Sequence, residues 1–215
     1  MDMKRIIKII VPVLLGVLLV VLLCLCKSSN SNVQEYGEAA EEATDKAKDS
    51  SLNSLIVAWD AYLEADSLSK ANEEPVSDEL RDVPKIICDK LLALDADLQG
   101  KTDSASLALS ETYLRFIEDI YKVVGKDSGV KLDNYGRVVR LTHDKYGEEI
   151  PTGEAIAGWK VRLSDAYVEE GKSAVELWQL DGNSKEKTRA NSDFKKALEL
   201  NPQNSEAEKE LEKIY

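Results

Sequence analysis

The residues that could do chemistry gather in one glycine-rich segment, residues 129–153. Its polar and aromatic side chains are of the kind that bind an anion or a sugar: Tyr135, Arg137, Arg140, His143 and Tyr146. Irregular segments carried on a helical scaffold are common places for sites. If these side chains converge on a pocket, the segment forms a small-ligand site or an enzyme site.

His143, the only histidine, has no companions for metal binding or catalysis. Asp144 follows it, but no second histidine, nearby cysteine or glutamate at metal-ligand spacing accompanies it. The chain also has no G-x-S-x-G elbow, no G-x-x-x-x-G-K-[ST] phosphate loop, no G-x-G-x-x-G turn after a strand and no H-E-x-x-H helix. We therefore expect no catalytic residue, no metal site and no cofactor, and we expect the protein not to be an enzyme.

An apolar run dominates the N-terminal part of the chain. Residues 9–26 are 18 residues without a charge, and three basic residues precede them, Lys4, Arg5 and Lys8. A helix of that length reaches roughly 27 Å, close to the thickness of a hydrocarbon core. It also exceeds the ~7–15 apolar residues of a cleavable signal peptide. We expect residues 9–26 to cross a lipid bilayer as a signal anchor.

The charges on either side of this run predict its orientation. Only Lys27 follows closely before the chain becomes acidic from Glu35 onward. Basic residues flanking a membrane helix stay preferentially in the cytoplasm. We therefore expect a single-pass protein with residues 1–8 in the cytoplasm and residues 27–215 outside it, in the periplasm if the cell is bacterial.

The cysteines allow lipidation as an alternative to an uncleaved anchor, and they exclude a disulfide within the exported part. Lipidation of Cys24 or Cys26, or cleavage behind the run, competes with an uncleaved anchor, although the leucine before each cysteine does not fit the small residue of a lipobox. Beyond the run only Cys88 remains, so no disulfide can form within the exported part. Because Cys88 lies beside an apolar helical stripe, we expect a small buried hydrophobe rather than a reactive thiol.

The exported part is acidic. The chain has 28 basic and 40 acidic residues, and removing Lys4, Arg5, Lys8 and Asp2 leaves 25 and 39, a net charge of −14. Nucleic-acid binding depends on a basic surface, and an acidic surface also repels anionic lipid headgroups. We therefore expect no nucleic-acid partner and contact with the bilayer only through residues 9–26.

Behind the anchor the sequence predicts a spacer and an all-α domain. Residues 27–51 have almost no large apolar residue, which is typical of a spacer whose Ala/Glu part can be a semi-rigid helix. In residues 52–150, apolar side chains recur at three- and four-residue spacing in stretches that start near positions 52, 84 and 104. Short connections favour an antiparallel helical bundle.

The sequence predicts some helix ends within residues 52–150 less precisely than others. Ser77 and Asp78 could cap an earlier start of the second helix, and Gly125 ends the third. After Gly125 we expect a short helix over residues 134–146. Strands are not expected, because runs such as Val138 and Val139 are too brief to build a sheet.

The last part of the chain, residues 151–215, has a characteristic spacing of small and aromatic residues. Phe194 stands four residues after Ala190, Ala197 follows three later, and Leu200 and Pro202 complete the pattern. The alanines permit close approach of a neighbouring helix, Phe194 fills the gap and Pro202 stops the helix. This stretch resembles the second helix of a tetratricopeptide repeat.

The next segment resembles the first helix of a following repeat. Ser205 and Glu208 have the spacing of a capping box, and Ala207, Leu211 and Ile214 share one face. Upstream, two stretches compete for the repeat's own first helix. One consists of Trp159, Leu163, Ala166, Tyr167 and Gly171, and the other of Ala174, Leu177, Trp178 and Leu180.

The resemblance implies a scaffold whose stacked helix pairs present a concave surface to a peptide or a partner helix. It brings no catalytic residues. On this basis Arg162, Asp165, Tyr167 and Glu169 are the candidate contacts with a protein partner, although solvated helix faces around a tyrosine that belongs to the core are the favoured alternative. The sequence thus favours a membrane-anchored, exported helical scaffold for protein–protein interaction, with the ligand site in residues 129–153 as the alternative.

Overall fold

The computed structural model describes residues 33–73, 75–132, 138–145 and 148–214. The predicted cytoplasmic residues 1–8 and membrane-spanning residues 9–26 lie outside this part of the chain. Among the described residues, no helix combines the length and the apolar character needed to cross a membrane.

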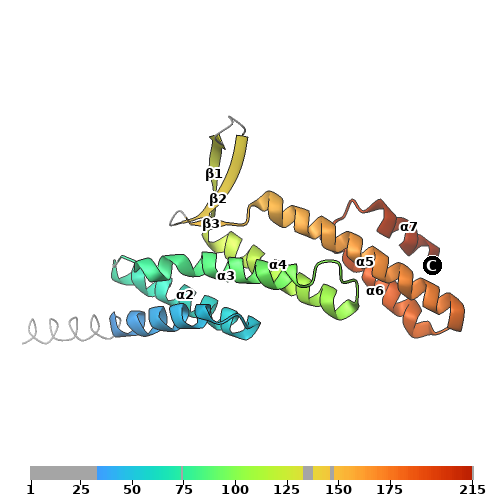
Figure 1. Ribbon diagram of the computed structural model, residues 1–215, viewed down its shortest axis with the longest axis horizontal. Helices are drawn as coiled ribbons and strands as arrows, with labels where there is room; N and C mark the ends of the chain where they lie inside the picture. Colours follow the sequence, from blue (N-terminus) through green and yellow to red (C-terminus); the bar gives the residue numbers. More distant parts are fainter. Residues whose placement is uncertain (1–32, 74, 133–137, 146–147, 215) are drawn as a thin grey trace, which may run out of the picture. The chain divides into compact units, whose positions relative to one another are not determined.

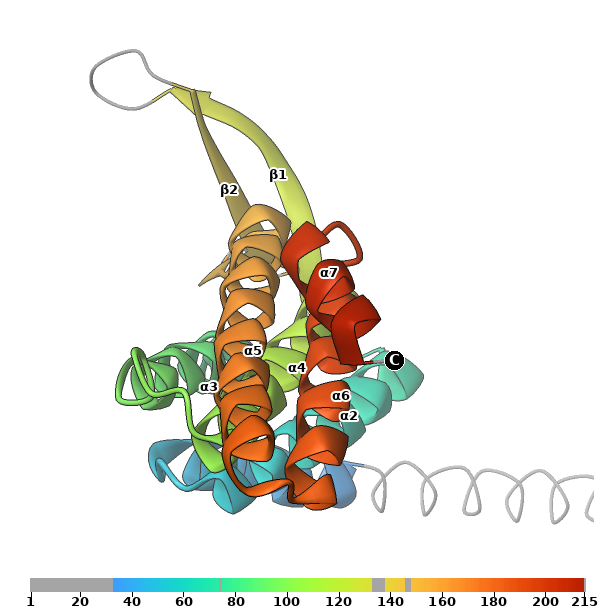
Figure 2. The same cartoon turned by 90° about the vertical axis from the view of Figure 1, so that its right-hand side faces the viewer.

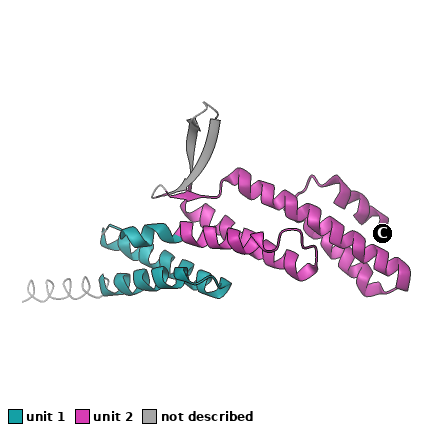
Figure 3. Cartoon of the chain, viewed as in Figure 1, with its two compact units in different colours: residues 1–83 teal, residues 84–215 magenta. Residues whose placement is uncertain are grey.

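The chain divides into two compact units, residues 1–83 and residues 84–215 (Figure 3). The division falls within helix α3, Asp78–Ala96, at Pro84. Proline has no backbone N–H and cannot donate the helical hydrogen bond at its position.

The first unit is built from a helix over residues 33–48, helix α2 over Leu52–Asn72, and the first turns of α3. Ala39, Ala43 and Ala47 are buried. Their four-residue spacing gives the first helix a flat stripe that allows close packing. The described portion of the predicted spacer is therefore a packed helix. The Tyr36 hydroxyl accepts a hydrogen bond from the backbone N–H of Ser77 at 3.1 Å and connects this helix to the start of α3.

Helix α2 carries much of the core of this unit. Ser51 caps it by accepting a hydrogen bond from the N–H of Ser54. The rings of Trp59 and Tyr62 stack with centroids 5.1 Å apart and planes inclined by 9°. The buried apolar residues of the helix are Leu55, Ala58, Trp59, Ala61, Tyr62 and Ala65.

The helix starts follow the capping residues of the sequence. The Ser77 hydroxyl accepts a hydrogen bond from the N–H of Leu80 at 3.3 Å, so the earlier start of the second predicted helix is confirmed. Helix α4, Ser104–Val124, begins after Asp103, whose carboxylate accepts from the N–H of Ser106. It ends before Gly125, as predicted.

A three-stranded antiparallel sheet replaces the helix expected over residues 134–146. Its strands are β1, Gly125–Leu132, β2, Val138–Asp144, and β3, Glu149–Ile150, in the order β1-β2-β3 (Figure 1). Val130 pairs with Arg140, and Thr142 with Ile150. The prediction of a helix was wrong because glycines disfavour a helix here and β-branched residues fit a strand, while the pairing between strands is not visible in either segment alone.

Three helices complete the second unit: α5, Gly153–Asp181, α6, Ser184–Leu200, and α7, Ser205–Ile214. Figure 2 shows α5, α6 and α7 side by side. Gly182 has φ +68°, the left-handed conformation that glycine adopts easily, and it allows the sharp reversal from α5 to α6. Both stretches proposed for a repeat's first helix lie on the single helix α5. The helical class predicted for the fold is confirmed, with the small sheet as an addition.

Candidate functional site

The small-residue pattern of α6 forms the contact between α6 and α5. Ala190, Phe194 and Ala197 are fully buried. A Cβ added at Gly171 of α5 would lie 2.6 Å from Cε1 of Phe194, so the glycine leaves the room that the ring occupies. The other predicted packing residues are less enclosed: Leu200 and Leu211 are half-buried, and Pro202 is exposed just after α6.

Gly171→Ala is expected to destabilise the second unit by about 2 kcal/mol. The new methyl group would clash with the buried Phe194 ring, which has no free space to move into. Gly158 on the same helix is the matched control, since nothing lies within 4 Å of a Cβ there. Gly158→Ala is expected to stabilise by about 0.5–1 kcal/mol, because alanine is the better helix former. Amide hydrogen exchange of α5 measures both effects, and the same sign in both variants would contradict this account.

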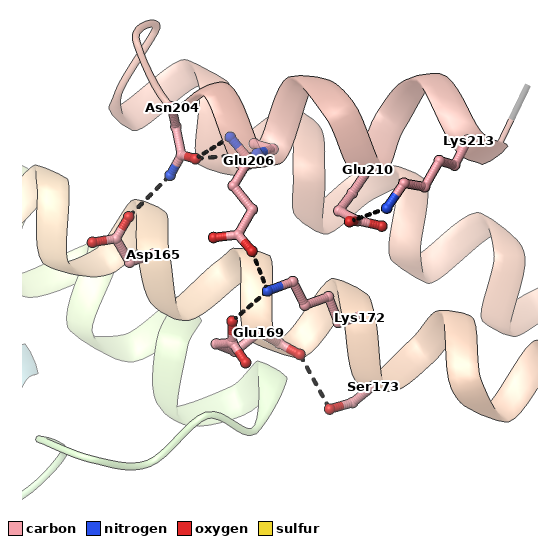
Figure 4. Close-up of polar contacts among 9 residues, drawn as sticks. Asp165, Glu169, Lys172, Ser173, Asn204, Glu206, Glu210 and Lys213 are labelled. Carbon is pink, nitrogen blue, oxygen red and sulfur yellow. Dashed lines mark hydrogen bonds and ion pairs between the residues drawn. The ribbon is translucent and has the colours of Figure 1, made fainter.

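Asn204 connects α7 to α5. Its side-chain NH₂ donates to Asp165 at 3.0 Å (Figure 4). The same NH₂ group donates to the Ser164 hydroxyl at 2.8 Å. Its oxygen accepts from the backbone N–H groups of Glu206 and Ala207 at 3.2 and 3.1 Å. One amide thus caps α7 and holds that cap against α5.

A second contact between α5 and α7 is ionic. The Lys172 ammonium lies 2.8 Å from a Glu169 oxygen and 2.5 Å from a Glu206 oxygen (Figure 4). The hydrogen bonds to both carboxylates raise the pKa of Lys172, and the bond to Lys172 lowers the pKa of Glu206. Because these groups are solvated, this pairing orients α7 more than it stabilises it.

A buried polar cluster joins α3, α4 and α5. The Ser110 hydroxyl donates a short hydrogen bond to Asp95, and the Trp159 indole N–H donates to the Ser110 oxygen at 3.2 Å. The Arg162 guanidinium completes the cluster, with Nη2 2.6 Å from the second Asp95 oxygen. Asp95 is therefore a buried charge with partners on both of its oxygens, which is the condition for tolerating it in a core.

A second cluster joins α4, α5 and α6 around Glu111. Glu111 accepts hydrogen bonds from the Tyr167 hydroxyl at 2.9 Å and from Arg115, while the Lys196 ammonium lies 3.5 Å away. Burial raises the pKa of Glu111, but Tyr167, Arg115 and Lys196 together outweigh burial and leave it below its ordinary value. Burial and the bond to Glu111 raise the pKa of Tyr167.

The four residues expected to contact a partner have internal partners. Tyr167 is a core residue whose long side chain reaches Glu111 across the α4–α5 contact, as the favoured alternative has it. Arg162 is half exposed but pairs with Asp95, and Asp165 accepts from Asn204. Glu169 is exposed and pairs with Lys172. Within the described chain, these side chains position helices.

An open groove runs along α4 and α5 and reaches the end of α6. One hollow of about 260 Å³ lies over Leu114, between Glu111, Glu199 and Leu200. A second hollow of about 300 Å³ lies by Tyr121 and the first turn of α5. The two share Glu118, Lys122 and Lys160 in their walls, so we treat them as one groove, the α4–α5 groove.

The charges in the α4–α5 groove alternate. Lys160 pairs with Glu118 at 2.5 Å, and Lys122 pairs with Asp119 at 3.0 Å. Arg115, Lys122 and Glu199 lie exposed at its rim. Such a surface offers both donors and acceptors to an extended or helical segment.

Only some residues of the alternative ligand site lie in the described part of the chain. Tyr135, Arg137 and Tyr146 lie outside the described residues, whereas Arg140 and His143 are positions of strand β2. In the ranges that the structure describes, no three His, Cys, Asp or Glu residues form a group that could hold a metal ion. Cys88 is buried and forms no disulfide with another described residue, in line with its predicted packing role. The ligand site in residues 129–153 stays a prediction.

The buried polar residues were not anticipated from the sequence, although a signal for them exists. Ser110 and Glu111 stand three and four residues after Leu107, and Asp95 stands four after Leu91. They occupy core positions of apolar helical stripes, where a polar residue needs a partner. The identity of those partners depends on how the helices pack.

The fold and the groove define a helical protein with a polar, open surface between helices. Comparisons with known protein families, curated proteins and solved structures found no match to this chain.

Proposed function

We propose that this protein is a membrane-anchored scaffold that binds a segment of another protein in the α4–α5 groove. In this proposal residues 9–26 anchor the chain in the bilayer and the helical units act outside the cytoplasm. Helices α5 and α6 act as a tetratricopeptide-like pair, with α7 as the first helix of a following unit. The protein is not an enzyme in this proposal and needs no cofactor.

The observation that carries the proposal is the groove itself. Its walls belong to helices that two buried polar clusters hold in place, so the surface is preformed rather than assembled on binding. Arg115, Lys122 and Glu199 are exposed at its rim and Leu200 is half-buried in its wall, whereas Leu114 beneath the groove is fully buried. A polar, partly charged surface of this kind can offer hydrogen bonds and ion pairs to a segment of another protein.

Site-specific photo-crosslinking in the native membrane tests this proposal. A photoreactive amino acid at position 122 or 199 lies in the groove, whereas position 176 or 185 is equally exposed but outside it. We expect the groove positions to capture the same protein and the control positions not to capture it. Mass spectrometry of the captured chain would also identify its bound segment.

Charge reversal provides the matched control. Lys160→Glu places a second carboxylate beside Glu118 in the groove and is expected to reduce the capture at least tenfold. Lys185→Glu makes the same change at an exposed position of α6 and should leave it unchanged. Capture that is equal at all four positions, or insensitive to Lys160→Glu, would refute the groove as the binding surface.

A further inference from the structure

Asp193 is a buried carboxylate on α6 that lacks the partners of the other buried acids. The residue is 5% exposed, and its Oδ2 atom is enclosed without a hydrogen-bond partner. Asp95 and Glu111, by contrast, each accept hydrogen bonds from neighbouring side chains. An ionised carboxylate in this position bears a desolvation cost that no donor offsets, whereas a protonated one does not.

The surroundings of Asp193 contain charges of both signs. From α5 it faces Glu170 and the Tyr167 hydroxyl, and from its own helix Arg189 and Lys196. The terminal nitrogens of Arg189 pair with Glu186 at 3.1 Å and with Glu170, while its Nε atom is buried without a partner. Lys196 pairs with the Glu111 cluster that α4 contributes. The negative charge of Glu170 therefore opposes the ionisation of Asp193. The positive charges of Arg189 and Lys196 offset this effect only in part.

We propose that Asp193 makes the packing of α6 on α5 depend on pH, firmer in mildly acidic solution, where Asp193 carries a proton, and looser at neutral pH. Protonation removes the buried charge and gives the side chain a donor. This pH dependence does not rely on the proposed protein partner, since it concerns the stability of the α5–α6 pair itself. It would make the scaffold more rigid in an acidic compartment.

The direction of the effect follows from proton linkage. Burial, followed by the charge of Glu170, raises the pKa of Asp193 to about 6, against 3.8 for an ordinary aspartate. The native state then binds the proton more tightly than the unfolded chain does, so the free energy of unfolding falls as pH rises from about 4 to about 6 and stays low above. Glu111 acts in the opposite direction, and mainly below its ordinary value of 4.5.

Amide hydrogen exchange of the full-length chain in mild detergent tests the proposal at pH 5.0 and 7.5, with rates corrected for intrinsic exchange. Both pH values lie above the ordinary value of 4.5, so Glu111 contributes only a small difference, and in the opposite direction. We expect the protection of the α6 amides to fall about tenfold between the two pH values. In Asp193→Asn, an uncharged side chain of the same shape, the α6 amides should keep equal protection at both.

Two further variants exclude other causes. Asp97→Asn makes the same substitution at an exposed position and should retain the tenfold change. Glu170→Gln removes the opposing charge and should reduce the change, so the proposal stays testable even if Asp193→Asn fails to fold. A wild-type chain with no pH effect in α6, or a tenfold effect that survives in Asp193→Asn, would overturn the proposal.

Discussion

Phe194→Ala is expected to lower the stability of the second unit by about 3–5 kcal/mol. The ring is fully buried between α6 and α5, and it occupies the space that the missing Cβ of Gly171 leaves. Truncation therefore removes the buried ring and leaves a cavity, and both terms are unfavourable. Because most domains are stable by only about 5–15 kcal/mol, this change is expected to expose much of α6.

Amide hydrogen exchange of α5 and α6 measures this loss. Leu180→Ala is the control, since Leu180 is 84% exposed on α5 and its truncation should change stability by less than about 0.5 kcal/mol. A loss below 1 kcal/mol in Phe194→Ala would mean that the contact between Phe194 and Gly171 does not determine the packing of the two helices.

Arg162→Ala is expected to cost about 3 kcal/mol. The substitution leaves the Asp95 carboxylate, whose side chain is 4% exposed, without its cation. Breaking a buried pair from one side typically costs about 3–5 kcal/mol, and we expect the lower end because the Arg162 side chain is 48% exposed. The Ser110 hydroxyl still donates to Asp95 and prevents a larger loss.

A double-mutant cycle with Asp95→Asn checks that the loss arises from this pair, with an expected coupling of about 1–3 kcal/mol. Lys122→Ala is the matched control, because the Lys122–Asp119 pair is exposed on both sides and should contribute less than about 0.5 kcal/mol. Equal effects of Arg162→Ala and Lys122→Ala would contradict a structural role for the Asp95 cluster.

These two contacts also bear on the proposed function. The Asp95 and Glu111 clusters hold the helices that form the walls of the α4–α5 groove, and the Phe194 contact holds α6 against α5. A partner bound in the groove would stabilise this arrangement by mass action. Variants of these internal contacts should therefore weaken binding through stability, whereas Lys160→Glu should weaken it while the fold is retained.

Local sequence determined the helices and their caps. The apolar stripes fall within helices of the structure. The predicted cap at Ser77 and the predicted stop at Gly125 lie at helix boundaries, because capping and periodicity are properties of neighbouring residues. Local spacing also accounts for the shared burial of Ala190, Phe194 and Ala197, since residues three and four apart lie on one helix face.

Only the tertiary structure decided which residues meet. Strands β1 and β2 form because two segments pair across residues 133–137, and neither segment predicts a sheet by itself. Asp95 finds Arg162 and Glu111 finds Tyr167 across distances of more than 50 residues in the chain, and the Oδ2 atom of Asp193 finds no donor. The way the helices pack decides which side chains pair with a buried charge. The apolar periodicity of a single helix does not predict that packing.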